Sequence, residues 1–351
     1  MGLKQKLWQD KNVLITGHTG FKGSWLTLML SELGAKVVGL ALPPTEPQSL
    51  YVDAKISSLL EREYIQDIRN LPEINKVFES ERIDYVIHLA AQALVRNSVR
   101  DPLESITTNI TGTANVVMAA LNSKTVMGIT VVTTDKVYKN LDWAWPYRES
   151  DTLGGNDSYS ASKAASELIV NALATSNNPR EIPVTTVRAG NVIGGGDWGE
   201  ERLVPDLIRS IMSSSVLTIR NANATRPWQY VLDCLYGYLL VAQAHLEQQP
   251  HLPNAFNFGP KESLTVAELV RLFEESLNRQ VPFEILESNI QEHGRLALDS
   301  HRAESLLGWK PSLTPRQSIT QTADWYSKFL AGSDAQELMR DETKKHRGNA
   351  W

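Results

Sequence analysis

The feature that most limits the fold is a glycine-rich loop near the N-terminus. Gly17, Gly20 and Gly23 form a G-x-x-G-x-x-G motif directly after the apolar run Asn12–Thr16 and at the start of the helical pattern Phe21–Leu33. Such glycines let the backbone approach a pyrophosphate at the N-terminus of a helix, so the motif predicts a dinucleotide-binding strand–helix unit. The alternative is a glycine-rich turn that serves packing alone.

The first half of the chain repeats this alternation of apolar runs and amphipathic stretches. The predicted strands are Ala35–Leu42, Tyr64–Ile68, Asp84–Ala91, Gly128–Thr134 and Val184–Ala189, and the predicted helices are Leu71–Glu81, Pro102–Asn122 and Ser158–Ala174. Strands rich in Val, Ile and Leu that are separated by helices are typical of a parallel sheet covered on both faces. The order therefore predicts an α/β fold with a doubly wound parallel sheet, the Rossmann arrangement.

The pattern changes after about Gly190, and a chain of 351 residues is long enough for two lobes. We predict a dinucleotide-binding domain over residues 1–189 and a smaller C-terminal α/β substrate-binding lobe over 190–332. The chain is expected to return to the first domain near 228–246, and residues 333–351 to form a polar, peripheral tail. Within the lobe, the pattern predicts a helix over Leu203–Met212, a strand over Asn254–Gly259 and a helix over Leu264–Leu277.

Composition excludes several classes of protein and site. Lys plus Arg is 35 and Asp plus Glu is 40, a net charge of −5 that argues against a nucleic-acid-binding protein. The single cysteine, Cys234, permits neither an intramolecular disulfide nor a cysteine-based zinc site, and the seven histidines show no metal-binding spacing. We expect no metal. No apolar stretch is long enough to span a membrane and the N-terminus lacks a signal-peptide core, so the sequence predicts a cytoplasmic protein.

A catalytic group is predicted on the helix after the fifth strand. Tyr159 and Lys163 are four residues apart and therefore share one helix face, where an ammonium group favours the phenolate of a tyrosine base. Thr134, Asp135 and Lys136 follow a strand at the sheet edge where parallel sheets bind ligands, and Thr134 is expected to hydrogen-bond the substrate hydroxyl. The alternatives are a surface Tyr–Lys pair and an Asp–Lys ion pair in a loop.

The cofactor side departs from the usual pattern because no acid follows the second strand, which ends Leu42-Pro43-Pro44. Such an acid binds the adenosine ribose, and its absence leaves the choice between NAD and NADP open. His18 and Lys22 in the glycine loop are candidates for ribose or phosphate contacts; the alternative is a solvated loop face. Asp67 after the third strand is expected at the adenine edge, and His88 is expected to be a core histidine of its strand.

Together these residues resemble the extended short-chain dehydrogenase/reductase family, the NAD-dependent enzymes that act on nucleotide sugars. Nearly the whole chain takes part in the resemblance. Thr134-Asp135-Lys136 resembles the CDP-glucose 4,6-dehydratases, whereas dTDP-glucose dehydratases typically show Thr-Asp-Glu and 4-epimerases small neutral residues. The segments Arg188–Trp198, Arg202–Asp206 and Arg226–Tyr230 strengthen the match.

The resemblance implies a reaction and a set of site residues. CDP-D-glucose would become CDP-4-dehydro-6-deoxy-D-glucose plus water, with NAD as a regenerated cofactor, Tyr159 as base, Lys136 acting at carbon 5 and Asp135 protonating the leaving 6-hydroxyl. The implied cofactor-binding residues are Gly17, His18, Gly20, Phe21, Lys22, Gly23, Asp67, Ile68, Leu89, Ala90, Ala91, Asn109, Tyr159 and Lys163. The implied substrate-binding residues are Gln92, Thr134, Asn191, Arg202, Leu203, Val204, Arg220, Arg226 and Gln229.

The chemistry of the substrate residues fits a nucleotide diphosphate. Arg202 and Arg226 can pair with its phosphates, and Asn191 can donate to a phosphate oxygen. Trp198 or Trp228 can pack on the base or sugar, although core packing is the favoured alternative for at least one of them. Arg220 adds a positive charge to the lobe, its alternative being a solvated side chain.

Further expectations follow from the family alone. The helices Pro102–Asn122 and Ser158–Ala174 are candidates for a homodimer interface, with a tetramer as the alternative, and the pathway would be deoxysugar synthesis for lipopolysaccharide. Two other functions stay open. One is a nucleotide-sugar 4-epimerase, against which the Asp135–Lys136 couple argues. The other is a non-enzymatic NAD(H)-sensing module, since a fold does not fix a function.

Overall fold

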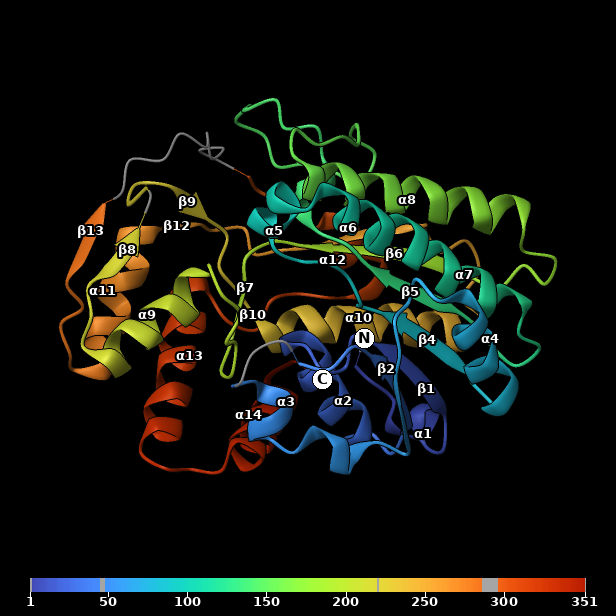
Figure 1. Cartoon of the computed structure of the whole chain (residues 1–351), viewed down its shortest axis with the longest axis horizontal. Coiled ribbons are helices and arrows are strands. Elements are labelled where there is room, and N and C mark those ends of the chain that lie inside the picture. The colour runs from blue at the N-terminus through green and yellow to red at the C-terminus, as the bar shows by residue number, and fades with distance from the viewer. Residues whose placement is uncertain (1, 45–47, 220, 286–295, 351) are drawn as a thin grey trace.

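The computed structural model describes residues 2–44, 48–219, 221–285 and 296–350, and its centre is a seven-stranded sheet (Figure 1). The strand order is β11-β6-β5-β4-β1-β2-β3, and all neighbouring strands are parallel. The strands are β1 (Asn12–Thr16), β2 (Lys36–Ala41), β3 (Arg62–Ile65), β4 (Tyr85–His88), β5 (Ile129–Val132), β6 (Val184–Ala189) and β11 (Ala255–Phe258). The predicted doubly wound parallel sheet is confirmed.

Side chains of the central strands alternate between two apolar cores, one on each face of the sheet. Val13 and Ile15 of β1 belong to one core, whereas Leu14 between them belongs to the other. This is the two-residue period of a strand whose faces are both covered, and it explains the continuous apolar runs in the sequence. His88 is buried at the end of β4, as predicted for a core histidine.

Helices cover each face of the sheet. The helices α2 (Phe21–Glu32) and α10 (Val231–Leu246) contribute to one core, and α4 (Leu71–Ser80), α7 (Thr113–Asn122) and α8 (Ser158–Ser176) contribute to the other. The predicted helix over Pro102–Asn122 is α6 (Pro102–Ile106), a π-helical turn η2 (Thr107–Gly112) and α7 in succession. The shorter elements are α1 (Gln5–Trp8), α3 (Leu50–Asp53), η1 (Ile56–Leu59), α5 (Val95–Arg100) and η3 (Asp135–Val137).

The chain leaves the sheet after β6 and returns to it through α10 and β11. All residues of α10 are buried, as expected for a helix that is apolar on every side. The strand β11 pairs with β6 in the register Ala255↔Thr186, which extends the sheet by one strand. The return therefore falls close to the predicted range 228–246, while the domain boundary at residue 189 stays a prediction.

The remaining segments build a smaller lobe, at the left of Figure 1. Its helices are α9 (Leu203–Ser213), α11 (Val266–Leu277) and α13 (Pro315–Leu330), whereas α12 (His301–Leu307) contacts β11 and α10 at the sheet. The strand pairs of this half of the chain are β7 (Val192–Ile193) with β10 (Gln229–Tyr230), β9 (Thr225–Arg226) with β12 (Leu264–Thr265), and β8 (Leu217–Ile219) with β13 (Phe283–Ile285). The expected polar tail is instead a helix, α14 (Ala335–Ala350), which contacts α2, α3 and α13.

Candidate active site

The glycine loop joins β1 to α2 at the carboxyl edge of the sheet. Gly17 has a φ of +80°, a conformation that other residues rarely adopt, and Gly20 is the N-cap of α2. A side-chain carbon at Gly23 would stand 2.1 Å from the Gly17 carbonyl oxygen, so the turn closes only with glycine there. The loop thus leaves an open helix N-terminus for a pyrophosphate, which is the fit that an NAD cofactor requires.

The side chains of His18 and Lys22 do not extend into solvent from this loop. His18 is fully buried, its Nε2 lies 2.7 Å from the Glu63 carboxylate, and burial lowers its pKa. Lys22 points instead toward α10, where its Nζ lies 3.4 Å from the Tyr238 hydroxyl. The alternative of a solvated loop face is therefore wrong for His18, which is buried against Glu63, whereas the predicted contacts of His18 and Lys22 with the cofactor stay a prediction.

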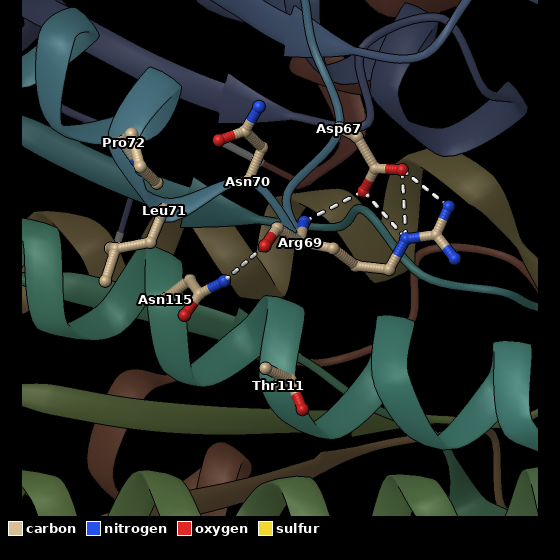
Figure 2. A pocket seen from close by; sticks show the side chains of 7 residues that line it. All are labelled: Asp67, Arg69, Asn70, Leu71, Pro72, Thr111 and Asn115. Carbon is tan, nitrogen blue, oxygen red and sulfur yellow. Dashed lines mark hydrogen bonds and ion pairs between the residues drawn. The ribbon is translucent and has the colours of Figure 1, made fainter.

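The predicted adenine edge is an open groove of about 560 Å³ between the end of β3 and α7 (Figure 2). The Asp67 carboxylate accepts hydrogen bonds from the backbone and guanidinium groups of Arg69, and this contact lowers the pKa of Asp67. Ile68 is buried in the core beside the groove, whereas Asn115 borders it and donates to the carbonyl groups of Ile68 and Arg69. Asp67 and Arg69 thus present a paired charge to the groove.

Asn109 links the end of β4 to the catalytic helix. Its side-chain oxygen accepts from the Gln92 backbone N–H at 2.9 Å, and its amide nitrogen donates to the Ser162 hydroxyl at 2.9 Å on α8. Asn109 lies in the π-helical turn η2, a distortion often found at functional sites. Closer to the glycine loop, the backbone N–H groups of Leu89 and Ala90 donate to Thr16 at 3.2 Å, and Ala91 follows them.

Four predicted catalytic side chains lie together at the carboxyl ends of β5 and β6. Thr134 caps the turn η3 and its hydroxyl donates to Asp135 Oδ1 at 2.9 Å. Tyr159 and Lys163 lie on the same face of α8, where Lys163 Nζ donates to the Val132 carbonyl at 3.1 Å. Lys136 is exposed, and its Nζ stands 6.0 Å from the centre of the Tyr159 ring.

Burial shifts the charge states of these groups. It raises the pKa of Tyr159 to about 12, against the opposing effect of the Thr134 hydrogen bond, and lowers the pKa of Lys163 to about 8, with the Lys22 charge acting in the same direction. Asp135 is only 5% exposed, and burial raises its pKa despite the nearby positive charge of Lys136. The site therefore holds a carboxyl group with an increased tendency to keep its proton, beside a phenol and an ammonium group.

The predicted substrate residues come from the smaller lobe and its junction with the sheet. Arg202 pairs with Asp197 at 3.1 Å, and Arg226 on β9 donates to the Thr225 carbonyl at 2.9 Å. The buried Gln229 amide has no hydrogen-bond partner among the described residues, while its backbone N–H donates to the Asn191 carbonyl at 3.0 Å. A buried unpaired amide is unfavourable, so it needs a partner beyond the described protein groups, either an ordered water or a ligand.

Other predicted substrate residues have different roles. Val204 is buried in the main core and Leu203 packs against it, so both anchor the start of α9. Trp198 and Trp228 are buried, and their indole N–H groups donate to Asp53 and to the Leu264 carbonyl. Both tryptophans therefore pack in the core, the alternative to stacking on the base or sugar. Arg220 lies outside the described residues.

A buried ion pair behind the catalytic helix was not predicted. Glu167 accepts three hydrogen bonds from the Arg188 guanidinium and further ones from the hydroxyls of Thr133, at 2.5 Å, and Thr186, at 3.2 Å. Glu167 follows Lys163 by four residues and Tyr159 by eight, so the helical spacing could have placed all three on one face. The sequence offered no sign of which partner on β6 the carboxylate meets.

The described residues contain no group of three or more His, Cys, Asp or Glu side chains arranged to hold a metal ion. Among them there is also no helix long and apolar enough to cross a membrane.

The known proteins that are similar to this chain in sequence belong to one family of nucleotide-sugar enzymes. The sequence profile of the NAD dependent epimerase/dehydratase family matches residues 13–259. A CDP-glucose 4,6-dehydratase of Salmonella typhimurium is 36% identical over 344 residues, which cover 95% of each chain. A dTDP-glucose 4,6-dehydratase of Haemophilus influenzae is 27% identical, covering 90% of this chain and 97% of the relative.

Solved structures of similar shape support the fold. A dTDP-glucose 4,6-dehydratase from Streptomyces venezuelae with NAD bound superposes with a TM-score of 0.80 at 22% identity, covering 91% of this chain and 98% of that one. A UDP-glucose-4-epimerase from Stenotrophomonas maltophila, also with NAD bound, reaches 0.81 at 22% identity, covering 92% and 100%. Because both dehydratases and epimerases share this shape, the choice between them depends on the site residues.

Proposed function

The chain belongs to the NAD dependent epimerase/dehydratase family, and from this premise we propose that it converts CDP-D-glucose to CDP-4-dehydro-6-deoxy-D-glucose plus water. The observation that carries the proposal is the buried carboxyl of Asp135 beside Thr134 and Tyr159. Epimerisation at carbon 4 needs no acid at the 6-hydroxyl, whereas dehydration does. A carboxyl group whose pKa is raised by burial is suited to donate that proton.

The residues that would hold NAD are those of the glycine loop, the groove at Asp67 and the catalytic helix. When bound, NAD accepts a hydride from carbon 4 of the sugar and returns one to carbon 6. Tyr159 takes the proton of the 4-hydroxyl, and Thr134 hydrogen-bonds the same oxygen. The positive charge of Lys163 on the same face of α8 stabilises the phenolate.

The elimination of water requires two further proton transfers. Oxidation at carbon 4 makes the hydrogen on carbon 5 acidic, and Lys136 removes it. Asp135 donates its proton to the 6-hydroxyl, so that water leaves and a double bond forms between carbons 5 and 6. Carbon 5 regains a proton as carbon 6 is reduced by the hydride that a bound cofactor would return. Asp135 and Lys136 are adjacent in sequence, but one is buried and the other exposed, which suits an acid and a base acting on neighbouring carbons.

The cytosine base of the substrate is supported by the relative from Salmonella typhimurium, whose identity is higher than that of the dTDP-glucose relative from Haemophilus influenzae. The product would serve deoxysugar synthesis for lipopolysaccharide, and the protein would act in the cytoplasm. The buried Gln229 amide and the arginines Arg202 and Arg226 would contact the nucleotide diphosphate.

We also propose a homodimer formed through α6 and α8. These two helices contact one another on one side of the molecule (Figure 1). They expose apolar side chains, with Leu103 70% exposed on α6 and Leu168 58% exposed on α8. Ile106 on α6 and Ile169 on α8 are exposed as well, by 41% and 36%. A second copy of the chain would cover this surface, which is otherwise costly to leave in water.

The proposed reaction is tested with a panel of CDP-, dTDP-, UDP- and GDP-glucose and by product analysis. CDP-glucose carrying deuterium at carbon 4 should yield a 6-deoxy product with deuterium at carbon 6 of the same molecule. The variants Asp135→Asn and Lys136→Met should still reduce NAD in a single turnover, measured by absorbance, and accumulate a 4-keto sugar that keeps its 6-hydroxyl. Inversion at carbon 4 alone would identify an epimerase, and the absence of turnover on every sugar would favour a sensing module.

A further inference from the structure

The C-terminal helix α14 is polar in sequence but partly buried in the structure. Glu342, Thr343 and His346 are each less than a tenth exposed, although they lie within the charged segment Ala335–Ala350. Buried charged groups are unfavourable unless they have partners. The contacts of Glu342 and His346 therefore identify the residues to which α14 is attached.

Glu342 holds the end of β10. Its carboxylate accepts a hydrogen bond from the buried Tyr230 hydroxyl at 2.5 Å and another from the Gln321 amide of α13. Burial and the adjacent carboxylate raise the pKa of Tyr230, so the phenol stays a donor. Tyr230 is the last residue of β10, and α10 begins directly after it. The Glu342 carboxylate of α14 therefore holds the junction between β10 and α10.

His346 holds the first turn of α10. Its Nε2 lies 2.8 Å from Asp233 Oδ1, and Asp233 is fully buried. The same carboxylate accepts from the Ser312 backbone N–H at 2.8 Å and from the Ser312 hydroxyl at 2.7 Å. The His346 ring also lies edge-on to Tyr236, with ring centres 5.9 Å apart. The start of α10 is thus tied both to α14 and to the segment before α13.

The residues held by α14 adjoin those that we propose to contact the substrate. Gln229, with its unpaired buried amide, precedes Tyr230, and Arg226 lies three residues earlier on β9. Only two residue pairs, Gln229↔Val192 and Tyr230↔Ile193, join β10 to β7. So short a ladder contributes few hydrogen bonds, so the contacts of β10 outside it, that of Tyr230 with Glu342 among them, contribute to holding Gln229 and Arg226 in place.

We propose that α14 is a positioning element for the nucleotide-sugar site, in which Glu342 and His346 hold the junction of β10 and α10 and thereby place Gln229 and Arg226. The proposal rests on the proposed function, because it assigns the nucleotide sugar to that junction. Neither Glu342 nor His346 touches the substrate; both act through Tyr230 and Asp233. Their loss should weaken nucleotide-sugar binding without affecting the glycine loop.

The test compares Glu342→Ala and Tyr230→Phe, which remove the same hydrogen bond from its two sides. Each should raise KM for CDP-glucose by about 10-fold, the scale of a hydrogen bond to a charged group, while kcat and the Kd for NAD stay within about 2-fold. In the double variant, KM for CDP-glucose should rise little further than in either single variant, because the two groups act through one contact. Glu342→Gln keeps an acceptor and should restore most of the affinity.

Glu337→Ala is the matched control, since it makes the same substitution at an exposed position of the same helix and should leave KM unchanged. Amide hydrogen exchange should speed up in residues 226–233 of Glu342→Ala and stay unaltered in the glycine loop. A KM equal to that of the control, or an equal loss of NAD affinity, would overturn the proposal. If Glu342→Ala fails to fold, Tyr230→Phe and Glu342→Gln decide the question by the same criteria.

Failure of the proposed function gives a different result. In that case the unaltered protein does not turn over CDP-glucose at all, whereas failure of the positioning role leaves the unaltered protein active and its variants unchanged. Should another sugar of the panel be the substrate, KM for that sugar is compared in the same set of variants.

Discussion

At the scale of single residues, Tyr159 and Lys163 face the same burial with opposite consequences. Burial raises the pKa of the phenol to about 12 and lowers the pKa of the ammonium to about 8. Both shifts disfavour the charged form. A phenolate at neutral pH therefore depends on the positive charges around it, which makes the charge of Lys163 the quantity to test.

Replacing Lys163 with Met should move the acid limb of the pH–rate profile to higher pH. A nearby positive charge lowers the pKa of a phenol, so removing it raises that pKa and reduces the phenolate fraction at any given pH. Single-turnover reduction of NAD, followed by absorbance from pH 6 to 10, measures the limb. Lys163→Arg keeps the charge and is the matched control. If the pH–rate profiles of Lys163→Met and the unaltered protein coincide, Lys163 does not stabilise the phenolate through its charge.

Sequence and structure agree best where a residue acts through its backbone or its helical spacing. Gly17 and Gly23 were identified because only glycine permits their turn, and Tyr159 and Lys163 because four residues make one helical turn. The side-chain contacts of His18 and Lys22 could not be predicted in the same way. Their partners, Glu63 and Tyr238, lie 45 and 216 residues away in sequence.

At the scale of elements, the buried pair of Glu167 and Arg188 fastens α8 to β6. The two side chains are 0% and 3% exposed. Glu167→Gln should lower the free energy of unfolding by about 3–5 kcal/mol, because it leaves the Arg188 charge buried without its partner. Urea unfolding followed by circular dichroism measures the change. Lys328→Met breaks an exposed pair with Asp324 and should cost no more than about 1 kcal/mol. Similar losses of unfolding free energy in Glu167→Gln and Lys328→Met would show that burial does not strengthen the Glu167–Arg188 pair.

The elements most easily predicted were those whose apolar pattern faces the sheet. The helix over 102–122 was predicted as continuous, but the π-helical turn η2 interrupts it where Asn109 reaches toward Gln92 and Ser162. The helix α14 was expected to be a peripheral tail, since its composition is charged. Its burial comes from pairing Glu342 and His346 with distant groups, which periodicity does not reveal.

At the scale of the whole molecule, the exposed apolar surface of α6 and α8 leads to a prediction about assembly. Leu103→Glu and Leu168→Glu should each convert the dimer to a monomer, because a carboxylate in an apolar interface loses its hydration without gaining a partner. Sedimentation velocity over a range of protein concentrations measures the outcome. Leu330→Glu, at an exposed apolar position at the end of α13, should leave assembly unchanged. A dimer that survives both substitutions would place the interface elsewhere.

The strand order also bears on how the protein is made. The ribosome delivers β1 to β6 within the first 189 residues, yet one of the two neighbours of β6 is β11, at Ala255–Phe258. At about 5–20 residues per second, several seconds of translation separate the two strands. During that interval β6 can pair with β5 but its other edge stays open, and an open strand edge promotes aggregation. Slow translation after β6 should therefore lower the yield of folded protein more than slow translation after β11.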